Sequence, residues 1–274
     1  MSNAPVPAQP LWDPQQYSRF EAERDRAALD LLLRLPGDLE PRTIVDLGCR
    51  AGQHAALLKR RHPEASVTGL DSSAAMLEQA KALGADVDWV RADLAAWAPE
   101  QPLDLIFANA SLQWLPDHEA LLRRLTGLLA PGGVIAAQMP LAWDTLHYRT
   151  MRAVMAEGPW AGRISDRETI QALLSPEAYY SVLAEACEDV DVWSTTYLHA
   201  LTGPDAVLEW MKGTALRPHL TALADDPAMR DAYLSALSDA LSKAFPRRPD
   251  GVTLLPFPRL FLIARRRSDG GAGR

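Results

Sequence analysis

The stretch Thr43-Ile-Val-Asp-Leu-Gly-Cys-Arg-Ala-Gly52 joins an apolar, β-branched run to a turn that contains two glycines. Such a turn lets backbone N–H groups and the start of a helix approach a ligand closely, because glycine has no Cβ atom to collide. The dinucleotide-binding fingerprint would require glycine at positions 48, 50 and 53. Gly48 fits it, but Arg50 and Gln53 do not. The stretch therefore predicts a Gly-x-x-x-Gly turn that ends at Gly52, and it disfavours a nicotinamide dinucleotide.

Apolar runs of strand length recur through the first half of the chain. They are Thr43–Cys49, Ser66–Asp71, Val87–Asp93, Leu103–Asn109 and Gly133–Met139. The segments between them carry apolar residues at helical spacing, as at Leu121, Leu125 and Leu128. This alternation of strands and helices predicts parallel βαβ units in a doubly wound α/β sheet of the Rossmann-like kind.

The second half of the chain has a different pattern, in which long helical segments flank two further strands. Residues 141–188 and 203–250 have helical patterns, whereas Val190–Leu201 and Arg259–Arg265 are strand-like. We expect these two strands to form an antiparallel pair that completes a seven-stranded, mostly parallel sheet. The helical insertions would then form a lid over the carboxyl edge of the sheet, where open α/β folds bind ligands.

The same patterns divide the chain into four segments and predict one more helix near its start. That helix is expected over residues 14–35. The predicted segments are a mobile tail at 1–10, a cap helix with a cofactor-binding core at 11–140, the lid insertions with the last two strands at 141–265, and a mobile tail at 266–274.

The composition limits what the protein is expected to bind. Lys plus Arg number 28 against 35 Asp plus Glu, a net charge of −7 that argues against binding nucleic acid through its phosphates. The longest uncharged run, Leu125–Trp143, is interrupted by prolines and glycines and does not predict a membrane span. Cys49 and Cys187 form no disulfide or metal-ligand pattern, and the six histidines lack zinc-site spacing. No basic-then-apolar leader opens the chain, so we expect a cytoplasmic protein. We expect it to be a monomer or a homodimer. The lack of zinc-site spacing predicts that it holds no metal.

Polar side chains follow the predicted strands in an order that suits adenosine. Asp71 ends the second strand, where it is placed to accept hydrogen bonds from a ribose diol. Asp93 and Leu94 end the third strand and suit the amino group and neighbouring ring nitrogen of adenine. Each acid alone is more often a helix cap, and Met76 alone is more often a core residue. Together they predict an adenosine ligand without a pyrophosphate, as in methyltransferases that use S-adenosylmethionine. The predicted cofactor-binding residues are Asp46, Gly48, Arg50, Gly52, Asp71, Ser72, Met76, Asp93, Leu94 and Asn109.

Further motifs are scattered along the chain outside the turn. They are Trp12-Asp-Pro-x-x-Tyr17-x-x-Phe20-x-x-x-Arg24-x-Arg26, Phe107–His118, Gln138–Pro140, Gly158–Trp160, Ser175–Tyr180, Val192–His199, Glu209-Trp210, Gly213-Thr214 and Pro256–Phe261. In these segments, over residues 11–265, the chain resembles the trans-aconitate methyltransferase family. The resemblance implies methylation of one carboxylate of a small tricarboxylic acid, which gives a monomethyl ester.

The chain departs from the family pattern at two places. Family members have Gly-Cys-Gly-Pro-Gly at the turn, whereas Arg50 and Ala51 replace the second glycine and the proline here, and Ala27 replaces a common proline. The Arg50 guanidinium could pair with the carboxylate of the cofactor, point into solvent, or crowd the approach to the turn. We favour crowding, because the guanidinium would also lie near the sulfonium and ammonium groups of the cofactor.

The implied reaction sets the requirements for the acceptor site. A carboxylate is already ionised at neutral pH, so methyl transfer needs alignment rather than a general base, and no catalytic side chain is predicted. Arginine binds carboxylates through a bidentate fork, although a single arginine is more often a surface charge. Arg259 is the favoured anchor, because Phe257, Leu260 and Phe261 surround it in the sequence. The predicted acceptor-binding residues are Tyr17, Arg24, Arg26, Gln113, Trp160, Tyr180, His199 and Arg259, with Tyr179 and Arg217 as further candidates.

Three alternatives stay open at the level of the sequence. The acceptor could be another small acid, a natural product or a carrier-bound thioester. The chain could also be a non-catalytic homologue in which Arg50 has weakened cofactor binding. A nicotinamide-dependent oxidoreductase is the third alternative, which the spacing of the glycines disfavours.

Overall fold

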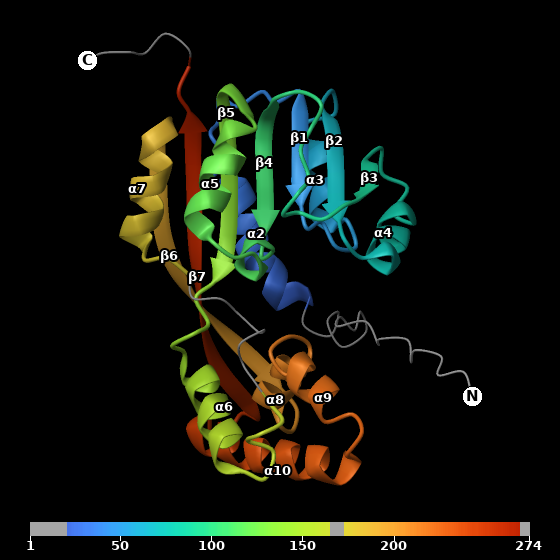
Figure 1. Cartoon of the computed structure of the whole chain (residues 1–274), viewed down its shortest axis with the longest axis vertical. Coiled ribbons are helices and arrows are strands. Elements are labelled where there is room, and N and C mark those ends of the chain that lie inside the picture. Colours follow the sequence, from blue (N-terminus) through green and yellow to red (C-terminus); the bar gives the residue numbers. More distant parts are fainter. Residues whose placement is uncertain (1–20, 165–172, 269–274) are drawn as a thin grey trace. The chain divides into compact units, whose positions relative to one another are not determined.

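The computed structural model describes residues 21–164 and 173–268 (Figure 1). Its seven-stranded sheet has the order β3-β2-β1-β4-β5-β7-β6. The strands are β1 (Thr43–Leu47), β2 (Ser66–Asp71), β3 (Asp88–Arg91), β4 (Leu103–Asn109), β5 (Leu129–Pro140), β6 (Cys187–Thr202) and β7 (Val252–Arg266). Strands β1 to β5 pair in parallel, and β7 runs antiparallel to β5. The predicted seven-stranded, mostly parallel α/β sheet is confirmed.

Five of the seven strands differ from their predicted bounds: β1 and β3 are shorter than predicted, and β5, β6 and β7 are longer. The differences in β3 and β7 are the ones that bear on the site. Strand β3 ends at Arg91, so Asp93 lies in the turn that follows the strand rather than at its end. Strand β7 begins at Val252, well before its predicted start. Pro256 and Pro258 interrupt this part of the sequence, and proline lacks the N–H group that a strand ladder uses. Because of these prolines, the sequence pattern did not predict the first half of β7.

Helices connect the strands, and several begin at the capping residues that the sequence supplies. The Ser73 hydroxyl accepts a hydrogen bond from the Met76 amide at the start of α4, and the Asp117 carboxylate caps α5 in the same way. The predicted helix at 14–35 is present as α2, and its part before residue 21 lies outside the described residues. The helices are α2 (Glu21–Leu33), α3 (Gln53–Arg61), α4 (Ala74–Lys81), η1 (Leu112–Trp114), α5 (His118–Gly127), α6 (Leu146–Glu157), α7 (Pro176–Ala186), α8 (Ala206–Lys212), α9 (Arg217–Ala222) and α10 (Pro227–Ala244).

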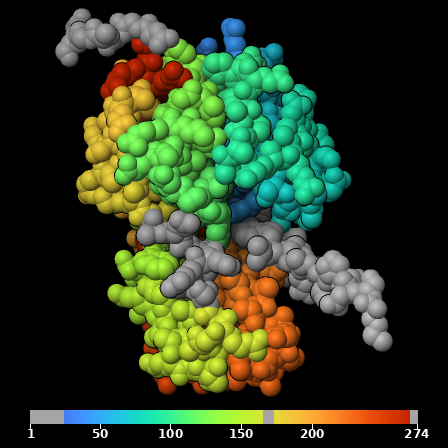
Figure 2. All heavy atoms as spheres, in the orientation of Figure 1, coloured from blue at the N-terminus to red at the C-terminus, as the bar shows by residue number. Residues whose placement is uncertain are grey.

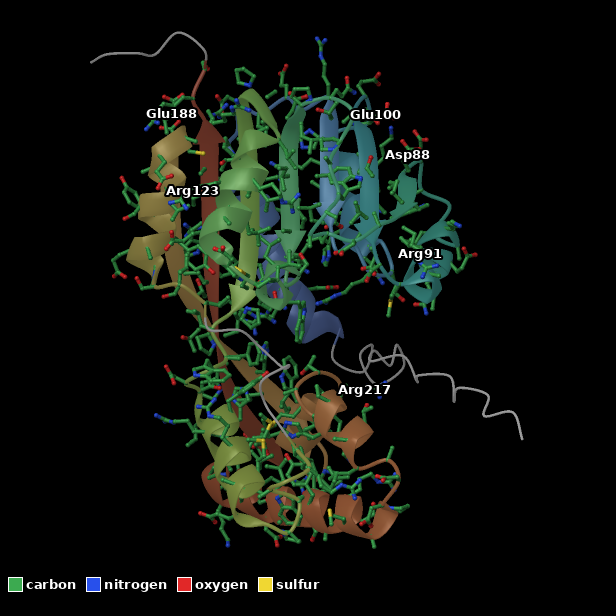
Figure 3. All side chains as sticks on the ribbon, viewed as in Figure 1. Asp88, Arg91, Glu100, Arg123, Glu188 and Arg217 are labelled. Atoms are coloured by element: carbon green, nitrogen blue, oxygen red, sulfur yellow. The ribbon has the colours of Figure 1, made fainter. Side chains whose placement is uncertain are left out.

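Helices cover both faces of the sheet. In the view of Figure 1, α5 lies in front of β4 and β5, and α2 lies behind the sheet. Figure 2 shows α5 and α7 meeting on the front face, where the guanidinium of Arg123 donates to both carboxylate oxygens of Glu185 at 2.8 Å (Arg123 is labelled in Figure 3). Because both faces are covered, β1 and β4 are buried at nearly every position.

The described residues form two compact units, and each has its own hydrophobic core. The sheet unit comprises residues 26–141, 173–196 and 258–268, and the helical unit comprises 21–25, 142–164 and 197–257. Strands β6 and β7 contribute residues to both units, so the predicted segment 141–265 is divided between them. Arg266, the first residue of the predicted C-terminal tail, is the last residue of β7.

The ring of Trp89 on β3 packs against the backbone of two glycines in the sheet unit. A Cβ atom at Gly69 of β2 would overlap this ring, and a Cβ atom at Gly52 would lie 2.5 Å from it. Glycine at these positions therefore allows the indole to lie against β2 and against the turn that follows β1.

We predict that Gly69→Ala lowers the free energy of unfolding by about 1–3 kcal/mol, because the added methyl forces Trp89 or β2 to move. Urea denaturation measures the change. Gly37→Ala is the matched control, because a Cβ atom there would have no neighbour within 4 Å. Equal stability of the Gly69→Ala and Gly37→Ala variants would contradict the packing argument.

Candidate functional site

The candidate site lies at the carboxyl edge of the sheet unit, where the strand order reverses between β1 and β4. Open α/β sheets bind ligands at this switch point. The turn after β1 is held by Gly48 and Gly52, whose φ angles are +76° and +84°. A Cβ atom at Gly48 would lie 2.5 Å from that of Ser111, whose hydroxyl donates to the Leu47 carbonyl. Glycine at position 48 therefore allows the segments after β1 and β4 to touch.

Asp71 faces this turn from the end of β2. Its two carboxylate oxygens accept hydrogen bonds from the backbone amides of Arg50, at 2.9 Å, and Ser73, at 2.8 Å. Each oxygen keeps a second lone pair after these bonds are made. The carboxylate is thus fixed in orientation and can still accept hydrogen bonds from a diol.

Arg50 bridges the switch point. Its φ angle of +53° is in the left-handed region, and its guanidinium donates to the carbonyl of Ala110 at 3.0 Å. Ala110 has a φ angle of +52°, and its carbonyl also accepts from the Gln113 side chain at 2.8 Å. Burial lowers the pKa of Arg50 to about 10, which the charge of Asp71 partly opposes, so Arg50 stays charged at neutral pH. Of the three alternatives for Arg50, the one in which the guanidinium points into solvent disagrees with this hydrogen bond.

Asp46 lies beneath the turn with 1% of its surface exposed. Neither of its carboxylate oxygens has a hydrogen-bond partner among the described residues. Burial raises the pKa of Asp46 to about 6, an effect that His54 counteracts and Asp71 reinforces. The backbone amide of Ala55 also lowers this pKa, although it lies outside hydrogen-bonding geometry. A buried carboxylate without a hydrogen-bond donor is suited to bind a cationic group of a ligand.

Four side chains from four elements form a hydrogen-bonded chain along the same edge. Arg259 of β7 donates to the side-chain oxygen of Gln138 on β5 at 3.2 Å. The Gln138 amide group donates to the side-chain oxygen of Asn109 on β4, and Asn109 in turn contacts Nδ1 of His54 on α3 at 3.4 Å. Arg259, Gln138 and Asn109 are buried.

The chain aligns with known proteins over nearly its whole length. It is 49% identical to the trans-aconitate 2-methyltransferase of Azoarcus sp. (strain BH72), over 94% of this chain and 100% of that protein. It is also 49% identical to the trans-aconitate 2-methyltransferase of Methylobacterium radiotolerans, over 94% of this chain and 99% of that protein. A methyltransferase domain family matches residues 44–133. The chain belongs to the trans-aconitate 2-methyltransferase family.

Solved structures share the fold at much lower sequence identity. The YcgJ protein of Bacillus subtilis has a TM-score of 0.57 at 14% identity, over 89% of this chain and 99% of that one. A phosphoethanolamine N-methyltransferase of Haemonchus contortus, solved with S-adenosylhomocysteine, has a TM-score of 0.54 at 17% identity, over 89% of this chain and 53% of that one. These similarities establish the fold alone.

The other predicted cofactor residues of this family member follow β2 and β3 in the chain. Ser72 is exposed, and its carbonyl accepts from Nε of Arg91 at 3.2 Å (Arg91 is labelled in Figure 3). Asp93 is exposed and Leu94 is half-buried in the turn after β3, where the Asp93 carboxylate accepts from the backbone of Ala95. Met76 is buried in α4. Their contacts with a cofactor stay a prediction.

The predicted acceptor residues are spread over both units. In the sheet unit, Arg259 and Gln113 are buried, whereas Arg26 and Tyr180 are exposed. The side-chain nitrogen of Gln113 donates a hydrogen bond to the Ala110 carbonyl. Its buried side-chain oxygen has no partner among the described residues, and an oxygen that only accepts hydrogen bonds cannot bind a carboxylate. Two further predicted acceptor residues cannot be placed: Tyr17 lies outside the described residues, and so does the side chain of Arg24.

Two further predicted residues pack in the core of the helical unit. The indole of Trp160 donates to the Val154 carbonyl at 2.8 Å and contacts the ring of Tyr233. The His199 ring stacks on Trp210 with their centroids 4.7 Å apart. The further candidate Arg217 begins α9 in this unit (Figure 3), and the other, Tyr179, is buried in the sheet unit against His118.

Sequence reasoning quoted Gln138 only as part of a family motif and did not place Gln138 or His54 in the site. A glutamine inside the apolar run of β5 was a usable signal, because a buried polar side chain needs a partner. His54 carried no such signal, because its contact with Asn109 depends on how α3 packs.

In the part of the chain that the structure describes, no group of three His, Cys, Asp or Glu side chains is arranged to hold a metal ion. No helix in those same residues is long and apolar enough to cross a bilayer.

The raised pKa of Asp46 gives a pH-dependent stability. The folded protein binds the Asp46 proton more tightly than the unfolded chain does. The protonated carboxyl therefore stabilises the folded state fully below pH 3.8, and this stabilisation is lost as the pH rises through about 6. We predict that Asp46→Asn raises the free energy of unfolding by about 1–3 kcal/mol at pH 7.5, with a smaller gain near pH 4.5. Denaturant titrations at both pH values measure it. The exposed Asp88→Asn is the control, and a loss of stability in Asp46→Asn at pH 7.5 would contradict the prediction.

Proposed function

We propose that this chain transfers a methyl group from S-adenosylmethionine to one carboxylate of trans-aconitate and thereby forms a monomethyl ester. The observation that carries the proposal is the 49% identity to a trans-aconitate 2-methyltransferase over that protein's entire length. The match includes the helical unit as well as the sheet, so it extends beyond the cofactor-binding core that many methyltransferases share.

The residues at the carboxyl edge fit the charges of S-adenosylmethionine. The buried carboxylate of Asp46 would hold the ammonium group of the cofactor, and the oriented carboxylate of Asp71 would accept hydrogen bonds from the ribose diol. Asp93 and Leu94 are the proposed adenine contacts, and Asn109 closes the site from β4. The cofactor, when bound, supplies an electrophilic methyl group on a sulfonium, which leaves as a neutral sulfide after transfer.

The protein's part in the reaction is to bind and orient the acceptor. A carboxylate attacks in its ionised form, so no side chain has to remove a proton. We assign the acceptor anchor to Arg259, which is 5% exposed and is oriented by its hydrogen bond to Gln138. Gln138 is neutral, so this hydrogen bond orients the guanidinium without cancelling its charge. Alignment and exclusion of water then account for the rate.

We place this reaction in the cytoplasm. Cys49 and Cys187 are buried free thiols, a state that a reducing compartment preserves. Burial raises the pKa of Cys187 to about 11 and also raises that of Cys49, which keeps both sulfurs protonated and unreactive.

The proposal predicts turnover of trans-aconitate in a methyl-transfer assay against a panel of di- and tricarboxylic acids. Arg259→Ala should raise the acceptor KM at least about tenfold, the loss expected for one charge-assisted contact. The Kd for S-adenosylhomocysteine, measured by calorimetry, should stay near the parent value. The exposed Arg42→Ala, at the opposite end of β1, is the control. Turnover of a different acid alone would identify another acceptor, and parent-like KM in Arg259→Ala would move the anchor elsewhere.

A second candidate function, a homologue with weakened cofactor binding, is favoured by the position of Arg50. The side chain bridges the segments that follow β1 and β4. The Arg50 backbone is left-handed, which costs about 1–3 kcal/mol for a residue other than glycine. A ligand that binds between the segments that follow these strands has to displace the bond to Ala110.

We therefore predict that Arg50→Gly tightens binding of S-adenosylmethionine about tenfold, which equals about 1.4 kcal/mol. Arg50→Ala removes the guanidinium but keeps the unfavourable backbone conformation, so it separates crowding from strain. Calorimetric titration of the three proteins in one buffer measures the effect. Weaker binding by both variants would show that Arg50 is a ligand of the cofactor.

A further inference from the structure

The register of the sheet brings Gln138 to Arg259. In the β5–β7 pair, Pro140 lies opposite Arg259 and Gln138 lies opposite Phe261, so Gln138 and Arg259 are diagonal neighbours on one face. In the parallel β4–β5 pair, Asn109 lies directly beside Gln138. The side chains of all three therefore project from the same face of the carboxyl edge.

The hydrogen bonds among these side chains have a fixed direction. A guanidinium can only donate, so Gln138 must present its oxygen to Arg259 and its amide nitrogen to Asn109. Asn109 then presents its own nitrogen to Nδ1 of His54, which accepts. The direction of the whole chain is thus set by Arg259 and passes through Gln138.

Gln138 also has a property that a carboxylate in its place would lack. It is fully buried, and its oxygen orients the guanidinium without contributing a negative charge. A glutamate of the same length would form an ion pair with Arg259 and compete with any carboxylate that approaches it.

We propose that Gln138 is a positioning residue of the acceptor site: it orients the guanidinium of Arg259 for a carboxylate-bearing acceptor and adds no negative charge beside it. The inference rests on the proposed function, because it takes Arg259 to be the acceptor anchor. Gln138 acts on the acceptor through Arg259 and does not take part in the chemistry itself.

The test compares Gln138→Glu, Gln138→Met and the parent enzyme, with trans-aconitate as acceptor at saturating S-adenosylmethionine. We expect acceptor KM to rise about tenfold in Gln138→Met, which loses the orienting bond, and at least about thirtyfold in Gln138→Glu, which also places a negative charge beside the guanidinium. The Kd for S-adenosylhomocysteine and kcat should change much less than KM. Gln101→Glu, an exposed residue before β4, is the matched control and should behave as the parent.

The order of the two variants separates positioning from a purely structural role. If Gln138 served only to fill space and satisfy Arg259, glutamate would be the milder change, because it keeps the shape and an oxygen for the guanidinium. A smaller rise in KM for Gln138→Glu than for Gln138→Met would therefore overturn the inference. If Gln138→Glu does not fold, as judged by thermal melting, parent-like KM in Gln138→Met would overturn it equally.

Failure of the inference is distinguishable from failure of the proposed function. Arg259→Ala is assayed beside the Gln138 variants. A raised KM in Arg259→Ala with unchanged KM in both Gln138 variants would overturn the role of Gln138 alone. Parent-like KM in Arg259→Ala would overturn the assignment of Arg259 as the anchor, and the inference with it. No turnover of trans-aconitate by the parent would overturn the proposed acceptor, and again the inference with it.

Discussion

The site depends on the close contact between the chain segments that follow β1 and β4. The Ser111 hydroxyl reaches across to the Leu47 carbonyl, and the contact leaves no room for a Cβ atom at Gly48. The positive φ angle of Gly48 turns the chain at the point where the sheet reverses its strand order. Asp46 lies on β1 just before this turn and Arg50 lies within it, so both residues are next to the same contact.

This arrangement is energetically unfavourable in the free protein. Asp46 is a buried carboxylate, and Arg50 and Ala110 have left-handed backbone conformations without being glycine. Each such feature costs on the order of 1–3 kcal/mol, and such features concentrate at functional sites. The core of the sheet unit offsets them, because β1 and β4 bury nearly every side chain on both faces. Stability is thus supplied by the interior of the strands and reduced at their carboxyl ends.

The sequence was sufficient to predict features that depend on local pattern. The β-branched runs and the glycine spacing predicted the sheet and the turn, because β-branched residues favour strands and glycine adopts positive φ angles without strain. The first half of β7 was missed because Pro256 and Pro258 disrupt the pattern of a strand that tertiary packing nevertheless forms. The direction of Arg50 could not be read from the sequence, because it depends on the Ala110 carbonyl, sixty residues away in the chain.

The acceptor anchor illustrates why register, rather than composition, decides such a site. Gln138 and Arg259 can meet only because β5 and β7 pair with Pro140 opposite Arg259. A shift of one residue in this pairing would turn Arg259 to the opposite face of the sheet, since side chains alternate along a strand. The register itself is fixed farther along the same strands, where Ile135, Ala137 and Leu262 pack in the core. The apolar interior therefore determines which polar side chains meet at the carboxyl edge, and the hydrogen-bonding limits of arginine then determine how the two amides between Arg259 and His54 are oriented.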